Sequence, residues 1–197
     1  MAEISKYPIQ EQAIVLSLLN TGVRRAELAG LTWSDFNFRD CTVHVNKSLL
    51  VFKDFGYQHT TTKESNDRYI DVAPEYMTFM QRYKEWWDTK KKLMGASWQR
   101  DMVTNKEDKR ESLMKLVGQE FVIIDDLAWP GNPAGLNKLV KRVAQKAGIS
   151  DIHPHMFRHT FVSLLMSNPD IGVATVAAEA GHAQPSTTLM IYTQQYK

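Results

Sequence analysis

The amino-acid sequence predicts a mainly helical α+β domain that contains a small antiparallel β-sheet. Apolar residues recur at helical spacing before residue 32 and again after residue 73, as they do in amphipathic helices. Between these regions, residues 42–72 contain alternating and β-branched segments of the kind that form strands. The chain has 197 residues, of which 43% are hydrophobic, so it can bury a sizeable core.

The N-terminal part of the chain predicts two helices followed by strands. Apolar residues from Ala13 to Leu19 have helical spacing, residues 20–22 interrupt the pattern, and it resumes from Ala26 to Leu31. We therefore expect a helix, a tight turn and a second helix. Residues 42–72 then predict two or three antiparallel strands joined by hairpins.

The rest of the chain predicts further helices. Pro74 begins a helix that runs to about Met94, and its largely aromatic face is expected in the core. The apolar segment FVIID, residues 121–125, predicts a short buried strand. Four more helices are predicted at Ala134–Ala147, ended by Gly148 at its C-terminal cap, at Pro154–Met166, at Val173–Ala180 and from Pro185 to about Tyr192.

Composition excludes some classes of protein. The chain has no run that approaches about eighteen apolar residues and no apolar signal-peptide core, so we expect a cytoplasmic protein that does not contact a membrane. Its single cysteine, Cys41, cannot form an intramolecular disulfide or a cysteine metal cluster. We expect Cys41 to be a small buried residue.

Positive charge is concentrated in two segments, although the net charge is only +2. Residues 82–115 contain ten Lys or Arg and six Asp or Glu. Residues 131–168 contain five Lys or Arg and one Asp. Such patches favour polyanions through counterion release, but solvated helix faces have the same composition. Charge alone therefore does not separate a nucleic-acid partner from an ordinary surface.

The segment HPHMFRHTF, residues 153–161, combines three histidines with one arginine. His155 and His159 are four residues apart and would share a helix face, but no HExxH pattern or nearby carboxylate accompanies them. We therefore expect no metal ion, and a metal-dependent hydrolase stays an alternative. His155 and Arg158 are three residues apart and hence neighbours on one face. A guanidinium beside an imidazole suits a phosphate group.

The segment HMFRHTF resembles the His-x-x-Arg motif of the tyrosine recombinases, the phage and transposon integrase family. Other segments match this family in the expected order along nearly the whole chain. TGVRRAEL resembles its first arginine box, which implies that Arg24 is catalytic and that Glu27 supports it. TKESNDRYIDV is similar to the hairpin that carries the family's lysine, here Lys63. AGHAQPSTTLMIYTQ resembles the segment with the last histidine, His182, and the nucleophilic tyrosine, Tyr192.

The resemblance implies a tyrosine recombinase catalytic-domain fold and a metal-independent DNA strand transferase without a cofactor. Tyr192 would attack one strand, become linked to the 3′ phosphate and free a 5′ hydroxyl, which conserves the bond energy for rejoining. Arg24 and Arg158 would bind the phosphate, because forked, permanently charged donors suit the charge of the pentacoordinate transition state.

The other matched residues have roles in proton transfer and orientation. A tyrosine hydroxyl has an unperturbed pKa of about 10, so its proton must be taken or shared. His155 is the candidate general base, and His182 is expected to donate to the phosphate or to steady the nucleophile. Lys63 is the candidate general acid for the leaving 5′ hydroxyl. Glu27 is expected to orient an arginine from a buried position.

Several assignments have competitors within the sequence. The competitors are Arg25 for the first arginine, Lys47 or Lys53 for the lysine, and Tyr196 for the nucleophile. The motifs favour the residues assigned above, and the lysine has the weakest match. His182 and Tyr192 are ten positions apart, one more than in many relatives. His153 and His159 are expected to pack or to cap a helix.

The resemblance also implies a domain organisation and a partner. Residues 1–197 would be a catalytic domain excised from a longer chain with N-terminal DNA-binding domains. The partner would be double-stranded DNA, with a tetramer on paired sites for the full-length protein and a monomer for the isolated fragment. Alternatives are strand relaxation like that of a type IB topoisomerase, and a catalytically silent DNA-binding regulator on the same scaffold.

Overall fold

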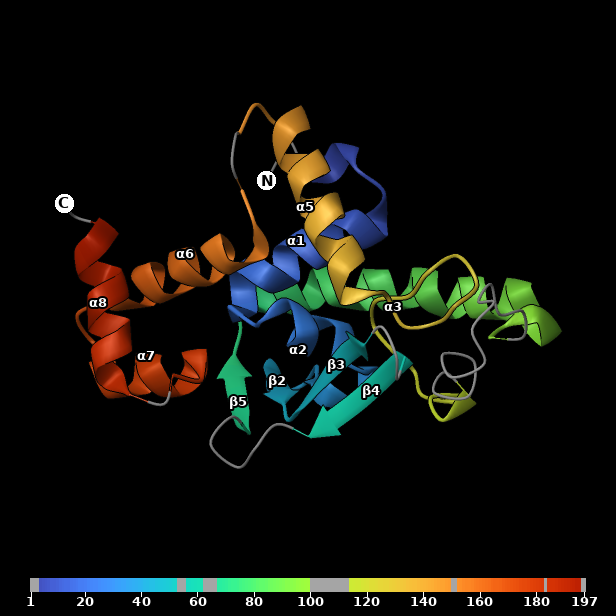
Figure 1. The fold of residues 1–197 in the computed structure, drawn as a ribbon, viewed down its shortest axis with the longest axis horizontal. Helices are drawn as coiled ribbons and strands as arrows, with labels where there is room; N and C mark the ends of the chain where they lie inside the picture. Colours follow the sequence, from blue (N-terminus) through green and yellow to red (C-terminus); the bar gives the residue numbers. More distant parts are fainter. Residues whose placement is uncertain are drawn as a thin grey trace.

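The computed structural model of the protein describes residues 4–52, 56–61, 67–99, 114–149, 152–182 and 184–195. Most of these residues form helices, and two small antiparallel sheets lie along the lower edge of the molecule in Figure 1. The predicted mainly helical α+β class is confirmed. The helices are α1 (Ile9–Thr21), α2 (Arg25–Gly30), α3 (Pro74–Met94), α5 (Pro133–Lys146), α6 (Pro154–Met166), α7 (Val173–Ala180) and α8 (Pro185–Gln195), with short 3₁₀ helices at Ile4–Lys6, Trp33–Asp35 and Gly95–Ser97.

The helices agree closely with the predicted ones. The bounds of α3, α6 and α7 are those predicted, and a tight turn separates α1 from α2. Gly148 follows α5 with a φ of 75°, the left-handed conformation that glycine adopts at the end of a helix. α8 extends to Gln195, beyond the predicted end near Tyr192.

The strands form two sheets, and residues 42–72 contain four strands instead of the predicted two or three. β1 (Phe36–Asn37), β2 (Thr42–Val45) and β5 (Arg68–Asp71) form a sheet in the order β1-β2-β5, and β3 (Lys47–Phe52) pairs with β4 (Gly56–Thr61). All pairs are antiparallel. The register places Val43 opposite Ile70 and Val45 opposite Arg68. Because these four side chains are buried, Arg68 lies on the core-facing side of β5.

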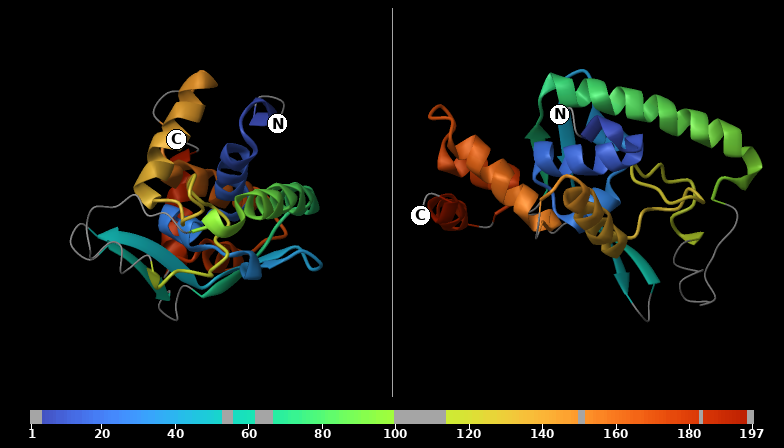
Figure 2. Two further views of the ribbon diagram at one scale, coloured as in Figure 1. Left: turned by 90° about the vertical axis from the view of Figure 1, so that its right-hand side faces the viewer. Right: turned by 90° about the horizontal axis from the view of Figure 1, so that it is seen from above.

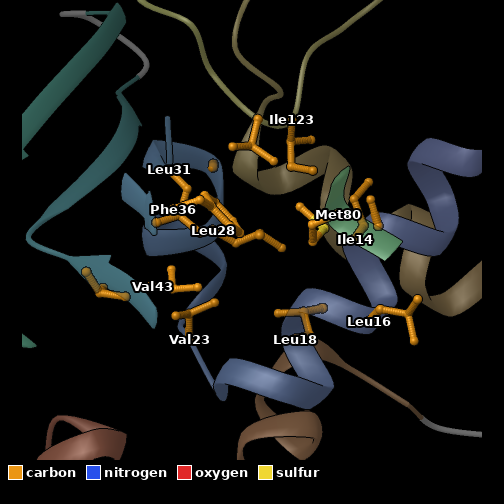
Figure 3. Packing of buried hydrophobic residues seen from close by; sticks show 14 of the residues in the cluster. Ile14, Leu16, Leu18, Val23, Leu28, Leu31, Phe36, Val43, Met80 and Ile123 are labelled. Atoms are coloured by element: carbon orange, nitrogen blue, oxygen red, sulfur yellow. The ribbon is translucent and has the colours of Figure 1, made fainter. Parts of the chain in front are cut away.

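The core lies between α1, α2, α3 and the three-stranded sheet (Figure 3). The aromatic face of α3 is buried as predicted, apart from the half-buried Trp86. Its polar atoms are paired within the core: the Tyr83 hydroxyl donates to the carbonyl of Val122 at 2.8 Å, and the Trp87 indole donates to that of Phe121 at 3.0 Å. These bonds satisfy groups whose burial would otherwise be costly.

Two expectations about buried residues are wrong. Residues 121–125 contain four buried apolar side chains, but they form only isolated bridges, from Phe121 to Thr32 and from Ile124 to Pro130, and no strand. A short apolar run indicates burial without fixing the backbone conformation, and here the backbone pairs with loops. Cys41 is half-buried instead of buried, and it has a φ of 52° in the turn between β1 and β2.

The turn between α1 and α2 packs directly against α6. Gly22 has a φ of 57°, and its N–H donates to the carbonyl of Leu18 at 3.1 Å. A Cβ at this position would lie 2.4 Å from Cδ1 of Phe161 on α6. Glycine is therefore required for both the left-handed backbone and the close approach. α6, α7 and α8 gather at the end of the molecule opposite the C-terminal end of α3 (Figures 1 and 2).

Candidate functional site

Four of the predicted site residues come together where three parts of the fold meet. They are Arg24 and Glu27 at the start of α2, Arg158 on α6, and His182 in the turn between α7 and α8. Arg24 and Glu27 are joined by an ion pair, and Arg158 and His182 by a hydrogen bond. Arg24 also donates a hydrogen bond to the carbonyl of Gly181, and Arg158 donates one to the carbonyl of Gly22. Residues far apart in the sequence therefore form one cluster.

Arg24 is held by Glu27 and by the end of α7. Its Nη1 lies 2.8 Å from Oε1 of Glu27, and its Nη2 donates to the carbonyl oxygen of Gly181 at 3.0 Å. Glu27 also accepts the backbone N–H of Arg24 at 2.8 Å, as an acidic residue does in the first turn of a helix. The Arg24 side chain remains 41% exposed, whereas that of Glu27 is 2% exposed. Glu27 is thus the predicted buried partner of an arginine.

Arg68 is a buried member of this cluster that sequence reasoning missed. It is 7% exposed, and its Nη2 lies 2.9 Å from Oε2 of Glu27. Burial raises the pKa of Glu27, but the hydrogen bond and charge of Arg68, together with Arg24, outweigh it and hold the pKa below its ordinary value. A signal existed in the sequence, because Arg68 and Ile70 alternate with the exposed Tyr69 and Asp71 and share the buried face of β5.

Arg158 is nearly excluded from water at 1% exposure. Its Nη1 donates to the carbonyl of Gly22 at 3.0 Å, and its Nε donates to Nε2 of His182 at 3.3 Å. Its Nη2 is buried and has no hydrogen-bond partner among the described residues. Burial, followed by repulsion from Arg24, lowers the pKa of Arg158 to about 9. The guanidinium therefore stays charged at neutral pH, with one donor left unused.

His182 links Arg158 to α8. Its Nδ1 lies 2.9 Å from Oγ1 of the fully buried Thr188. Burial, followed by the positive charges of Arg158 and Arg24, lowers the pKa of His182 to about 4, so the ring is neutral at pH 7. Since the Arg158 Nε only donates, Nε2 of His182 is the acceptor and Nδ1 carries the proton. His182 thus donates to Thr188 and accepts from Arg158.

A pocket of about 370 Å³ opens beside Arg24. Arg24, Arg25, Asn137, His153 and His155 are among its lining residues. The side chains of Arg25, His153 and His155 are exposed. Burial, followed by the nearby positive groups, lowers the pKa of His155. The pocket therefore presents two guanidinium groups and a neutral imidazole to solvent.

The sequence predicts that His153 and His159 pack or cap a helix, and the structure shows packing for His159. His153 occupies the N-terminal cap position of α6, but its side chain makes no capping hydrogen bond. The His159 ring packs edge-on against that of His155, with centroids 5.0 Å apart. Within the described ranges, no group of three or more His, Cys, Asp or Glu side chains is arranged to hold a metal ion.

Tyr192 lies on α8 and is half-buried. It follows Thr188 by four residues and so shares a helix face with the residue that bonds to His182. α8 packs against both α6 and α7. The nucleophile candidate is therefore carried by a helix that contacts the arginine cluster through Thr188 and His182.

The lysine assignment and two competitors fall on residues whose structure is not described: Lys63, Lys53 and Tyr196 lie outside the described ranges. Lys47, the other competitor, forms an ion pair with the buried Asp35. It lines a different pocket, together with Thr32 and Gln119. Its ammonium group is thus already bound by a carboxylate. No helix of the described residues is long and apolar enough to cross a membrane.

Comparison with known proteins places these residues in a family context. The model of the phage integrase family matches residues 1–197. Tyrosine recombinase XerC of Pediococcus pentosaceus is 27% identical over 186 residues, which cover 94% of this chain and 50% of that protein. The transposase from transposon Tn916 of Enterococcus faecalis is 26% identical over 186 residues, covering 90% of this chain and 40% of that protein. The chain thus spans about half the length of these curated relatives.

Solved structures show the same fold. The Tn1549 transposon integrase in complex with transposon right end DNA has a TM-score of 0.73 and 21% identity, covering 97% of this chain and 58% of that one. The XerA recombinase has a TM-score of 0.67 and 20% identity, covering 96% of this chain and 53% of that one. The arrangement of helices around small sheets is therefore shared with these proteins.

Proposed function

The chain belongs to the phage integrase family, and from this premise we propose that it cleaves and rejoins DNA at specific sites through a 3′-phosphotyrosyl intermediate. The strongest support for this proposal is the environment of Arg158. Arg158 is buried beside Arg24, and its Nη2 has no partner among the described residues. A buried, charged donor without a partner is costly unless an anion completes it. The phosphate of a DNA strand is the anion that we propose.

The two arginines suit the charge that develops on a phosphate. Both are fixed before substrate arrives, Arg24 by Glu27 and Gly181, and Arg158 by Gly22 and His182. Donors that are already oriented stabilise the pentacoordinate transition state without reorganising. Among the described residues, Arg24 and Arg68 share the carboxylate of Glu27, and Arg158 bonds to a carbonyl and an imidazole, which favours binding of a phosphate.

We propose Tyr192 as the nucleophile. Its hydroxyl oxygen would bond to phosphorus as the bond from phosphorus to the 5′ oxygen breaks. His155 would act as general base, because its imidazole, whose pKa burial lowers, is neutral at pH 7 and has a free lone pair for the tyrosine proton. Lys63 would protonate the departing 5′ oxygen. His182 would connect the phosphate site to the nucleophile's helix by holding both Arg158 and Thr188. Reversal on a partner strand rejoins DNA and needs no added energy source.

The test is covalent capture of DNA on a nicked duplex that carries the cognate site, because a short released fragment traps the phosphotyrosine. We expect Tyr192→Phe, which removes one oxygen atom, to abolish the adduct while DNA binding persists. Tyr196→Phe is the matched control and should retain the adduct. Adduct formation by Tyr192→Phe, or its loss only in Tyr196→Phe, would contradict the assignment. Unchanged adduct formation in the presence of a chelator is expected, and its loss would favour a metal-dependent hydrolase.

We propose double-stranded DNA as the partner and a tetramer on paired sites for the full-length protein. The alternatives make different predictions. Relaxation of supercoiled DNA without a recognition sequence would indicate an activity like that of a type IB topoisomerase. Binding without any adduct in the wild-type chain would indicate a catalytically silent regulator. Strand exchange between two site-bearing duplexes separates the recombinase from both.

A further inference from the structure

We propose that Arg68 is a positioning residue that holds Arg24 and His182 in their working arrangement, an inference that rests on the proposed function. Arg68 lies in the segment TKESNDRYIDV, but the family resemblance assigned a role there only to Lys63. The buried Arg68 guanidinium contacts both α2 and the end of α7. It lies at the start of β5. One side chain thus joins three segments that the chain brings together from distant positions.

The first connection runs through a carboxylate that two arginines share. Oε2 of Glu27 lies 2.9 Å from Nη2 of Arg68, and Oε1 of Glu27 lies 2.8 Å from Nη1 of Arg24 and 3.4 Å from Nη1 of Arg68. Arg68 is the buried partner and Arg24 is the more exposed one. Arg68 therefore fixes the position of the carboxylate that orients the more exposed Arg24.

The second connection fixes the turn that leads to His182. Nε of Arg68 donates to the carbonyl oxygen of Glu179 at 2.7 Å, in the last turn of α7. Carbonyl groups at a helix end lack partners within the helix and attract cations. Gly181 follows with a φ of 65°, and its carbonyl accepts Nη2 of Arg24 at 3.0 Å. Both arginines therefore hold the backbone directly before His182.

The fit of Arg68 against this turn is close. A Cβ at Gly181 would lie 2.9 Å from Nη1 of Arg68. The planar guanidinium reaches the Glu179 carbonyl and both oxygens of Glu27 in different directions. A lysine supplies the same charge at a single point and cannot make these bonds together. Arg68→Lys therefore removes the geometry of the connection and keeps its charge.

The kinetic test compares Arg68→Lys with the wild-type chain and with Arg142→Lys. Arg142 is a matched control, because its exposed side chain pairs with Glu11 away from the cluster. Single-turnover adduct formation on nicked DNA is measured at saturating protein, together with DNA affinity and thermal unfolding. We expect the rate of Arg68→Lys to fall by about 10- to 100-fold, as a small misplacement of site groups does, with affinity changed less than about threefold. An unchanged rate, or equal losses of rate and affinity, overturns the proposal.

A double-mutant cycle tests whether Arg68 acts through Glu27. The combined loss in Glu27→Gln with Arg68→Gln should be clearly smaller than the product of the single losses. Losses that multiply would show that Arg68 acts independently of Glu27 and would overturn the shared-carboxylate connection. The double variant replaces both charged groups, so neither Glu27 nor Arg68 leaves an unpaired buried charge. If a single Arg68 variant does not fold, the rate of the double variant can still be measured.

A titration of the His182 ring by NMR gives a readout that does not require catalysis. In the wild-type chain, burial and the positive charges of Arg158 and Arg24 lower the pKa of His182 to about 4. If Arg68→Lys releases the end of α7, the ring moves into water and its pKa rises by about one unit or more. An unchanged pKa in the folded variant overturns the positioning role. If the wild-type chain forms no adduct, the proposed function fails, while this titration still tests the placement of His182.

Discussion

Arg158 illustrates how a single residue can be placed for chemistry at the expense of stability. Its side chain is almost fully buried, and within the described part of the chain its hydrogen-bond partners are a carbonyl and a neutral imidazole. Removing a charge from water without a paired carboxylate is costly. A structural role alone would be filled better by an apolar residue of similar size. The arrangement is physically reasonable if a phosphate supplies the missing negative charge.

We predict that Arg158→Lys reduces catalysis far more than DNA binding. Lysine keeps the positive charge but cannot donate to Gly22 and His182 while presenting another N–H to a phosphate. The rate of adduct formation should fall by about 100-fold or more, as expected for loss of an oriented donor at a transition state. The measurement is single-turnover cleavage beside a binding titration. Arg39→Lys, at an exposed arginine, is the control, and parallel losses of rate and affinity would indicate uniform phosphate binding.

At the scale of elements, the site depends on two helix-ending glycines. Gly22 ends α1 and offers its carbonyl to Arg158, and Gly181 ends α7 and offers its carbonyl to Arg24. Both have positive φ. The left-handed turns therefore do more than end their helices, because they aim backbone oxygens at the two arginines.

We predict that Gly22→Ala destabilises the fold by about 1–3 kcal/mol, the cost typical of a strained left-handed residue, plus the cost of displacing Phe161. The added Cβ would lie 2.4 Å from the Phe161 ring. Denaturant unfolding measures the change. Gly135→Ala on α5 is the control, because a Cβ there meets nothing within 4 Å and alanine favours a helix interior. Equal stability of the two variants would show that the turn relaxes without cost.

At the scale of the whole molecule, we propose that residues 1–197 act as a catalytic domain. The matched region covers 50% and 40% of the two curated relatives. A domain that binds DNA alone touches fewer phosphates than a protein that encloses the duplex. We therefore propose that this chain binds DNA weakly and with little sequence preference.

We predict a monomer in solution and a reduced dependence of DNA affinity on salt. Each phosphate that the protein does not neutralise lowers the slope of log affinity against log salt concentration by about 0.9 in magnitude. Light scattering without DNA measures the mass, and salt titrations compare this chain with a longer form that includes N-terminal domains. A stable tetramer without DNA, or identical slopes for both forms, would contradict the proposed organisation.

The sequence by itself determined the helices and the identity of most candidate site residues. Helical periodicity and the positions of proline and glycine predict the bounds of α3, α6 and α7. Both signals depend only on residues that are close together in the sequence. The motif matches selected Arg24, Glu27, Arg158 and His182, which the fold brings together. These predictions needed only local information.

Only the tertiary structure decided which buried charges meet. Arg68 and Glu27 are 41 positions apart, and Arg24 and the Gly181 carbonyl are 157 apart. Alternation in the sequence places Arg68 on a buried face, but it does not identify the carboxylate with which Arg68 forms an ion pair. The same limit explains residues 121–125, whose apolar pattern reports burial but not the loops with which their backbone pairs. Periodicity records which side of an element faces the core, whereas the partner of a buried polar group depends on how distant elements pack.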